Sequence, residues 1–323
     1  MKTVLVTGSA GFIGSRTCHL LLDQGVEVIG IDCLNDAYDL RVKEHRLEGL
    51  KKRDGYINYR TNIENLEALD PIFRNHHFDV VFNLAARAGV RYSIIDPHVY
   101  MTTNANGTLN ILEMMRKYEL TRAIHASTSS LYAGQPLPFT EDSRVDTPLS
   151  PYAASKKAAE TLCATYQHLY GFDTIVLRYF TVYGPAGRPD MAPFRFIKWI
   201  DEGTPITVFG DGKQTRDFTF VDDIARGTVM AAGLSGYDTI NLGGGKRPIA
   251  LLDFIHLIEE RLGKKAEIDW QPMPATDMID TSADIKKAKE LMDWEPEFDL
   301  PEGLDQTVGW YLENRDWVKE VQL

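Results

Sequence analysis

One stretch decides the fold: Lys2-Thr3-Val4-Leu5-Val6-Thr7-Gly8-Ser9-Ala10-Gly11-Phe12-Ile13-Gly14. Its first half is a β-branched apolar run, and its second half carries three glycines at the spacing Gly-x-x-Gly-x-x-Gly. Apolar residues then recur at helical spacing from Cys18 to Gly25. The stretch therefore predicts a strand, a tight glycine turn and a helix, the unit that presents backbone amides and a helix N-terminus to a pyrophosphate.

An acidic residue follows the glycines at the distance that a dinucleotide site needs. A second apolar run, Val26 to Ile31, predicts a strand that ends in Asp32. A carboxylate about twenty positions past the glycines suits the ribose hydroxyls of adenosine and repels the extra phosphate of NADP. The glycine turn alone is equally compatible with an unliganded turn. Together with Asp32 it predicts a dinucleotide site that prefers NAD.

Strand-like and helical patterns alternate through the first half of the chain. We expect further strands at 56–61, 79–84, 122–127 and 174–178, and helices at 64–74, 97–118 and 150–171. This alternation predicts an α/β fold built on a Rossmann-type doubly wound parallel sheet.

The alternation is lost after the strand at 174–178, where a proline-punctuated loop begins. We expect a first domain at 1–180, which binds the dinucleotide, and a smaller C-terminal α/β substrate-binding lobe that mainly comprises 181–323. Some of its segments are expected to return to the first domain. Helical patterns recur at 193–202, 221–233, 251–262 and 303–311, with short strands at 206–209 and 239–242.

Composition excludes several classes of protein. The 323 residues carry 46 acidic against 35 basic side chains, a formal charge of −11, which argues against general binding to nucleic acid or anionic membranes. No apolar run reaches 18 residues and the first residues lack the pattern of a signal peptide, so we expect a cytoplasmic protein without a membrane span.

Cysteine and histidine spacing argues against disulfides and metals. Cys18, Cys33 and Cys163 are odd in number and widely separated, so they are interpreted as buried free thiols. The adjacent pair His76-His77 cannot face one metal ion from a helix. We therefore expect no metal site.

A candidate acid/base centre lies in Tyr152-Ala153-Ala154-Ser155-Lys156. Helical spacing puts the phenol of Tyr152 and the ammonium of Lys156 on one face, and a nearby cation favours the ionised phenol. With 14 tyrosines one such match is expected by chance, so the spacing alone favours two residues on a solvated helix face. The hydroxyl run Thr128-Ser129-Ser130 at the end of an expected strand strengthens the catalytic interpretation.

Taken together, these motifs resemble the extended short-chain dehydrogenase/reductase family. The resemblance rests on Thr7-Gly8-x-x-Gly11-x-x-Gly14, Asp32, Tyr152-x-x-x-Lys156 and Arg216-Asp217-Phe218-Thr219-Phe220-Val221-Asp222-Asp223. Within that family the chain is most similar to UDP-glucuronate 4-epimerases. That similarity rests on Leu34-Asn35-Asp36, Ala88-Gly89-Val90-Arg91-Tyr92-Ser93 and Phe180-Thr181-Val182-Tyr183-Gly184-Pro185-x-Gly187-Arg188-Pro189-Asp190-Met191-Ala192.

The resemblance implies NAD as the cofactor and a set of residues around it. The implied NAD contacts are Gly8, Gly11, Phe12, Ile13, Gly14, Asp32, Asn35, Asn62, Ile63, Leu84, Ala85, Ala86, Asn104, Tyr152, Lys156 and Tyr179. The implied contacts to a UDP-sugar are Arg91, Ser129, Ser130, Thr181, Arg188, Val208, Phe209, Arg216 and Asp277.

The resemblance also implies a mechanism. Tyr152 takes the proton of the sugar 4-hydroxyl, with Thr128 sharing the hydrogen bond, while the C4 hydride passes to NAD. The 4-keto sugar rotates and takes the hydride back on its other face, which converts UDP-glucuronate to UDP-galacturonate. Ser130 stands where related decarboxylases and dehydratases carry an acid, which favours plain epimerisation.

Three alternatives stay open from the sequence. The chain could epimerise neutral UDP-hexoses, decarboxylate UDP-glucuronate, or sense NAD without catalysis. Family members pair as homodimers through two helices, which correspond to 97–118 and 150–171 here.

Overall fold

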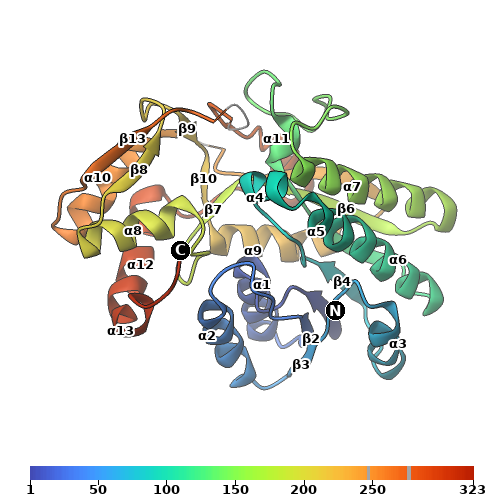
Figure 1. Cartoon of the computed structure of the whole chain (residues 1–323). Helices are drawn as coiled ribbons and strands as arrows, with labels where there is room; N and C mark the ends of the chain where they lie inside the picture. Colours follow the sequence, from blue (N-terminus) through green and yellow to red (C-terminus); the bar gives the residue numbers. More distant parts are fainter. Residues whose placement is uncertain (246–247, 275–277) are drawn as a thin grey trace.

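The computed structural model describes residues 1–245, 248–274 and 278–323 and is built on one parallel sheet of seven strands, in the order β11-β6-β5-β4-β1-β2-β3. The strands are β1 (Thr3–Thr7), β2 (Glu27–Asp32), β3 (Tyr56–Arg60), β4 (Val80–Asn83), β5 (Arg122–Thr128), β6 (Asp173–Tyr179) and β11 (Tyr237–Leu242). Helices connect successive strands, as right-handed parallel crossovers require. The predicted doubly wound sheet is confirmed (Figure 1).

Helices cover both faces of this sheet. They are α1 (Phe12–Asp23), α2 (Leu40–Lys51), α3 (Leu66–Asn75), α4 (Val90–Ile95), α5 (Pro97–Tyr100), the π-helical turn η1 (Met101–Asn106), α6 (Gly107–Lys117), the 3₁₀ turn η2 (Ser129–Tyr132), α7 (Pro151–Tyr170) and α9 (Val221–Met230), which continues into η3 (Ala231–Gly233).

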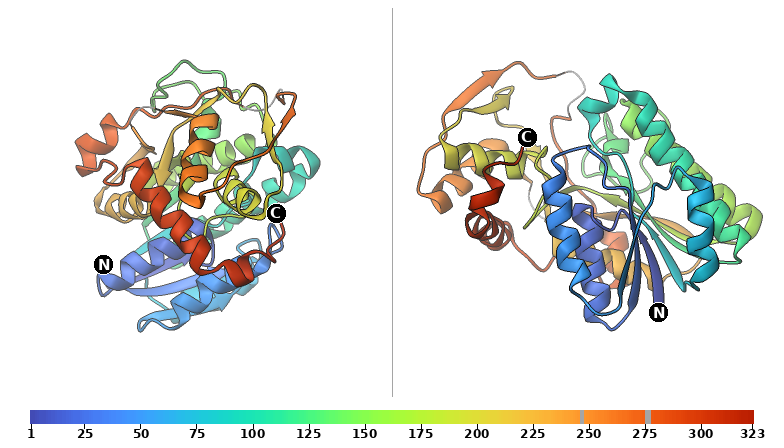
Figure 2. Two further views of the ribbon diagram at one scale, coloured as in Figure 1. Left: turned by 90° about the vertical axis from the view of Figure 1, so that its left-hand side faces the viewer. Right: turned by 60° about the horizontal axis from the view of Figure 1, so that its bottom comes forward.

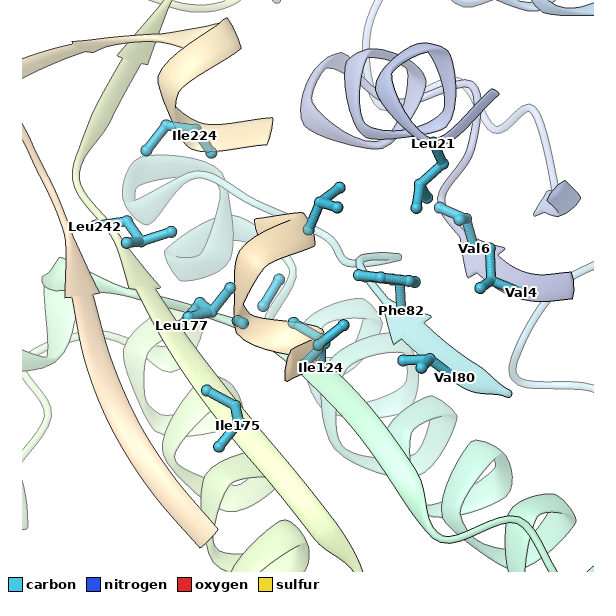
Figure 3. Packing of buried hydrophobic residues seen from close by; sticks show 14 of the residues in the cluster. Val4, Val6, Leu21, Val80, Phe82, Ile124, Ile175, Leu177, Ile224 and Leu242 are labelled. Atoms are coloured by element: carbon cyan, nitrogen blue, oxygen red, sulfur yellow. The ribbon is translucent and has the colours of Figure 1, made fainter. Parts of the chain in front are cut away.

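Side chains of alternate strand residues supply the two cores. Val4 and Val6 of β1 point to one face, where they join Leu21 of α1 and Ile224 of α9 (Figure 3). Leu5 points to the opposite face, which α3, α6 and α7 cover. Both faces are apolar because a parallel sheet is buried on both sides.

The order of the strands reverses beside β1, and this reversal positions the site. Thr7 at the end of β1 is in register with Ile31 of β2 on one side and with Asn83 of β4 on the other. Loops leaving these strand ends diverge to opposite faces of the sheet. A crevice at that point is where doubly wound folds bind ligands.

A second lobe packs over the carboxyl ends of the strands (Figure 1). It contains β7 (Thr181–Tyr183), α8 (Ala192–Glu202), β8 (Ile206–Phe209), β9 (Thr215–Arg216), β10 (Phe218–Phe220), β12 (Ile249–Ala250), α10 (Leu251–Leu262), β13 (Ile268–Gln271), α12 (Leu300–Glu313) and α13 (Arg315–Val318). Its core gathers aromatic and branched side chains of α8, α10 and α12. The smaller α/β lobe predicted from the sequence is thus present.

The last residues of the chain contact the start of helix α2 in the first domain. The backbone amide of Gln322 donates to Oδ2 of Asp39 at 2.8 Å, and Arg41 pairs with Glu320 at 3.4 Å. Figure 2 shows this red C-terminal segment beside the blue helix α2. The C-terminus therefore ties the second lobe to α2.

Several elements differ from their prediction. The strand expected at 239–242 is β11, which pairs with β6 at the edge of the main sheet, and α11 (Lys286–Met292) packs against it. The helix expected at 97–118 is divided into α5, η1 and α6. Helix α2 was not predicted because its sequence, Leu-Arg-Val-Lys-Glu-His-Arg-Leu-Glu-Gly-Leu-Lys, is too polar to show an apolar stripe.

Two further findings concern cysteines and membranes. Cys18 and Cys163 are buried as predicted, whereas Cys33 is only half-buried because it follows β2 into a loop at the crevice. Over the described ranges, no helix is long and apolar enough to cross a membrane.

Candidate active site

A cavity of about 380 Å³ lies at the carboxyl ends of the strands, beneath the second lobe. Most of the residues predicted for the site line it: Gly8, Gly11, Phe12, Ile13, Gly14, Asp32, Asn35, Asn62, Ile63, Leu84, Ala85, Ala86, Thr128, Ser129, Ser130, Tyr152, Lys156, Tyr179, Thr181, Arg188 and Arg216. Residues far apart in the sequence thus share one space.

The glycine turn opens one end of this cavity to a phosphate. Gly8 adopts a left-handed backbone, with φ +71°, and the first turn of α1 has no side-chain cap among the described residues. A Cβ on Gly14 would lie 2.1 Å from the carbonyl oxygen of Gly8. The turn is therefore as tight as glycine allows, and the uncapped amides at the helix N-terminus can bind an anion.

Asp32 ends β2 beside that turn. Its Oδ2 accepts from the amide of Ala10 at 3.1 Å, and its Oδ1 accepts from the amide of Leu34 at 2.8 Å. Each carboxylate oxygen keeps a further lone pair, so Asp32 can also accept from ribose hydroxyls. The glycine turn, the uncapped helix and this carboxylate fit a dinucleotide such as NAD.

Lys43 lines the same end and was missed by the sequence analysis. Its Nζ donates to the backbone oxygen and Oδ1 of Asn35, at 2.8 and 2.5 Å, and burial lowers the pKa of its ammonium. Lys43 belongs to α2, the helix that shows no apolar stripe. No sequence signal that we used could have found it.

Tyr152 lies at the start of α7, and the residue is buried, with 9% of its surface exposed. Ser150 caps the helix by accepting from the amide of Ala153 at 3.2 Å, and Pro151 fits the first turn. The ring of Tyr152 meets that of Tyr100 edge-on, with the centroids 5.9 Å apart. The cap and the ring contact fix the direction of the phenol.

The electrostatics of Tyr152 differ from the sequence-based prediction. We expected a nearby cation to bring the phenol closer to ionisation. Instead, burial raises the pKa of Tyr152 above its ordinary value, and it outweighs the hydrogen bond with Thr128 and the positive charge of Arg188, which both lower it. The phenol is therefore neutral near pH 7 in this structure.

Lys156 follows one helical turn later and is almost fully buried. Its Nζ donates to the backbone oxygen of Ala126 in β5 at 2.8 Å. Burial lowers the pKa of the Lys156 ammonium to about 8, while the charge of Glu160 raises it. The cation is thus present at neutral pH and fixed against β5.

Hydroxyl groups gather opposite these two residues. Thr128 ends β5 and caps the turn η2, which begins at Ser129. Its Oγ1 accepts from the amide of Ser130 at 3.1 Å. Thr181 begins β7 from the other side of the cavity. Four residues with hydroxyl groups, Thr128, Ser129, Ser130 and Thr181, therefore line the cavity that Tyr152 also lines, and Thr128 hydrogen-bonds to its phenol.

Two predicted arginines line the cavity, and both are already engaged. Arg188 binds Asp190 through two hydrogen bonds of 3.0 and 2.5 Å and also donates to the backbone oxygen of Ala88 at 3.1 Å. Arg216 donates to three backbone oxygens, including those of Met278 and Ile279. These contacts hold both guanidinium groups at the cavity wall.

The remaining predicted residues that the structure describes do not line the cavity. Asn104 is buried behind it, where its Nδ2 donates to Oγ of Ser155 at 2.9 Å and to the backbone oxygen of Arg87. Arg91 is exposed and stacks on the ring of Phe209 at 4.0 Å. The side chain of Val208 is fully buried in the core of the second lobe. Asp277 lies outside the described residues.

Metal-binding side chains do not gather in the part of the chain that the structure describes: no three His, Cys, Asp or Glu residues there could hold one ion. His76 instead meets the hydroxyl of Tyr59 at 2.8 Å.

A family model and a full-length relative, both named for epimerases, match this chain. Residues 4–243 match the model of the NAD dependent epimerase/dehydratase family. The chain is 54% identical, over the full length of both proteins, to the UDP-glucuronate 4-epimerase of Thermodesulfobacterium geofontis.

Two solved structures are also similar. One is UDP-glucuronic acid 4-epimerase from Bacillus cereus in complex with UDP-glucuronic acid and NAD, with TM-score 0.91 and 38% identity, covering 97% of this chain and 99% of that one. The other is UDP-glucose 4-epimerase from Thermotoga maritima with UDP-glucose, with TM-score 0.89, 31% identity and the same coverage.

Proposed function

The chain belongs to the NAD dependent epimerase/dehydratase family, and from this membership we propose that it is a UDP-glucuronate 4-epimerase that uses NAD to interconvert UDP-glucuronate and UDP-galacturonate. The observation that carries the proposal is the 54% identity, without a gap in coverage, to a relative named for that activity. The fold alone does not choose the sugar, because a UDP-glucose 4-epimerase shares it at TM-score 0.89.

Proton transfer is assigned to Tyr152. A buried phenol with a raised pKa holds its proton, so it can hydrogen-bond to the sugar 4-oxygen and return a proton to it. Thr128 and Arg188 lower the pKa of the phenol against the larger effect of burial, and the positive charge of bound NAD would add to theirs and favour the ionised form that takes the proton of the sugar 4-hydroxyl. NAD, when bound, supplies the hydride acceptor and donor and the positive charge of its nicotinamide ring.

Binding of the dinucleotide is assigned to the predicted residues around the glycine turn. The uncapped amides of α1 suit the pyrophosphate, and Asp32 suits the adenosine ribose. Lys156, held against the oxygen of Ala126, suits the nicotinamide ribose. Asn104 acts from behind, because it fixes Ser155 of α7 and the backbone of Arg87.

The sugar carboxylate is assigned to the hydroxyls of Ser129, Ser130 and Thr181. A 4-keto glucuronide is a β-keto acid, so loss of carbon dioxide competes with return of the hydride. Hydrogen bonds that hold the carboxylate out of the orientation for cleavage restrain that loss. A serine at position 130, which supplies no acid, supports epimerisation over decarboxylation.

The diphosphate and base are assigned to the second lobe. Arg216 is the principal diphosphate contact, and Arg188 contacts an anionic group of the sugar nucleotide while it stays bonded to Asp190. Phe209, Arg91 and Asp277 belong to the nucleotide end, where Val208 contributes through its backbone. In this proposal, 1–180 binds mainly NAD and 181–323 mainly the nucleotide sugar.

A homodimer is proposed as well. Its interface would use the helices at 97–118 and 150–171. Exposed apolar side chains at Met101, Leu169 and Tyr170 on these helices support an interface there. Placement in the cytoplasm stays a prediction from the sequence.

Incubation of the purified protein with UDP-glucuronate and NAD, followed by NMR, tests the function. We expect signals of UDP-galacturonate that approach a constant ratio to the substrate, with no net change in NADH absorbance. UDP-pentose with release of carbon dioxide would indicate a decarboxylase instead.

A parallel incubation with UDP-glucose separates the remaining alternatives. Conversion of UDP-glucose but not of UDP-glucuronate would assign a neutral-sugar epimerase. Bound NAD without turnover of either sugar would indicate a non-catalytic sensor and would end the proposal.

A further inference from the structure

A buried ion pair lies directly behind the cavity and is not used by the mechanism above. Glu160 of α7 and Arg178 of β6 have side chains that are 2% and 4% exposed. Nε of Arg178 donates to Oε1 of Glu160 at 2.9 Å, and Nη2 donates to Oε2 at 2.8 Å. Such a bidentate ion pair fixes the orientation of both side chains. Removal of one partner would leave the other as an unpaired buried charge, which is strongly destabilising.

Glu160 also touches the catalytic strand. Its Oε1 accepts from Oγ of Ser127 at 2.7 Å, and Ser127 lines the cavity immediately before Thr128. The pairing of β5 with β6 sets Ser127 beside Arg178 in the sheet. The carboxylate of Glu160 therefore joins α7 to the strand end that presents Thr128.

On α7, Glu160 stands one helical turn beyond Lys156, which itself stands one turn beyond Tyr152. This spacing puts the three side chains along one face of the helix. Lys156 donates to the backbone oxygen of Ala126, which carries no charge, and the carboxylate of Glu160 one turn away supplies negative charge that raises the pKa of the ammonium.

We propose that Glu160 is a positioning residue of the reaction, which fixes the Ser127–Thr128 end of β5 and supplies the negative charge that keeps the Lys156 ammonium protonated. This inference rests on the proposed function of the site. It gives the pair with Arg178 a purpose beyond stability, because Arg178 keeps the carboxylate ionised and in place.

The charged neighbours of Lys156 support this assignment. Burial would raise the pKa of Glu160, but the bonds from Arg178 and Ser127 outweigh it and hold that pKa below its ordinary value. Burial raises the pKa of Cys163 to about 12 and lowers that of His125 to about 3. At pH 7 both are neutral, so Glu160 carries the negative charge among these neighbours.

The decisive variant is Glu160→Gln, which keeps the size of the side chain and removes its charge. Without that charge the pKa of Lys156 falls, so its ammonium loses its proton at a lower pH than in the wild type. We expect the alkaline limb of the kcat profile to move down by about one pH unit. At pH 8, where the wild-type ammonium is about half protonated, this corresponds to a loss of about fivefold in kcat, with little change in KM.

A direct readout does not depend on catalysis. In protein labelled with ¹³C at the lysine ε-carbon, the Lys156 signal, identified by its absence in Lys156→Arg, titrates with the ammonium. We expect its midpoint to fall in Glu160→Gln and to be retained in Glu160→Asp. An inactive wild type would end the proposed function, whereas this midpoint would still test Glu160.

Asp223→Asn is the matched control, because Asp223 is a fully buried acid that pairs with Arg226 at 3.0 Å on α9. It should lower stability without moving the Lys156 midpoint. If Glu160→Gln does not fold, the double variant Glu160→Gln/Arg178→Gln removes both charges and should show a downward shift that is smaller, because loss of the Arg178 cation offsets part of the effect. An unchanged Lys156 midpoint in the folded variant would overturn the proposal.

Discussion

At the scale of single residues, Tyr152 combines chemistry that the sequence indicates with an environment that it does not. The Tyr-x-x-x-Lys spacing identifies the pair, because helical periodicity is a local property. The pKa of the phenol depends instead on burial, which raises it, and on Thr128 at the end of β5 and Arg188 of the second lobe, which lower it. These contacts cannot be obtained from spacing along the chain.

Tyr152→Phe removes the hydroxyl and keeps the ring contact with Tyr100. Because the proposed function makes the phenol the proton donor and acceptor for the sugar 4-oxygen, we expect kcat to fall by about a thousandfold. Conversion of UDP-glucuronate followed by NMR measures this. Tyr170→Phe, on the exposed end of the same helix, should keep full activity. Wild-type activity in Tyr152→Phe would remove the tyrosine from the mechanism.

At the scale of elements, the strand, glycine turn and helix at the N-terminus were predictable because their signals are local. Apolar runs, glycine spacing and a terminal aspartate all lie within 32 residues. Helix α2 was not predictable in this way, since Lys43 and Arg46 are buried among the apolar residues of its inner face and interrupt the apolar pattern. The division of the segment at 97–118 by the π-helical turn η1 also gave no periodic signal.

Gly14→Ala tests the glycine turn. The added Cβ would meet the oxygen of Gly8 at 2.1 Å, which is backbone and cannot move without opening the turn. We expect NAD affinity, measured by calorimetry, to fall by at least about tenfold, and stability to fall by about 1–3 kcal/mol.

Gly309→Ala in α12 is the control for that substitution. No described heavy atom lies within 4 Å of its added Cβ, so it should leave NAD binding unchanged and stabilise the helix by about 0.5–1 kcal/mol. Equal NAD affinity of Gly14→Ala and wild type would show that the turn does not contact the cofactor.

At the scale of the whole molecule, Arg46 joins the two parts that enclose the cavity. From α2 it donates to the oxygen of Ala10 in the glycine turn at 3.2 Å, and to the oxygens of Ala186 and Gly187 in the loop before α8. It also donates to the hydroxyl of Tyr38 at 2.7 Å. One buried guanidinium thus holds the dinucleotide turn against the loop that carries Arg188.

Arg46→Met leaves these backbone oxygens without their donor in a buried setting. We expect the free energy of unfolding in urea to fall by about 3 kcal/mol. Arg53→Met removes an exposed pair with Asp23 and should cost less than about 1 kcal/mol. Equal losses in the two variants would contradict a special role of Arg46 between the lobes.

The sequence by itself determined the doubly wound sheet, the glycine turn that Asp32 follows, and the placement of Tyr152 and Lys156 one helical turn apart, because strand and helix periodicities fix which residues share a face over short distances. Only the tertiary structure decided that Lys43 joins the cavity, that Asn104 stands behind it, and that Glu160 and Arg178 pair beneath Lys156. Burial and electrostatic contacts arise between segments more than a hundred residues apart as well as between neighbours, and so they are set by how the elements pack.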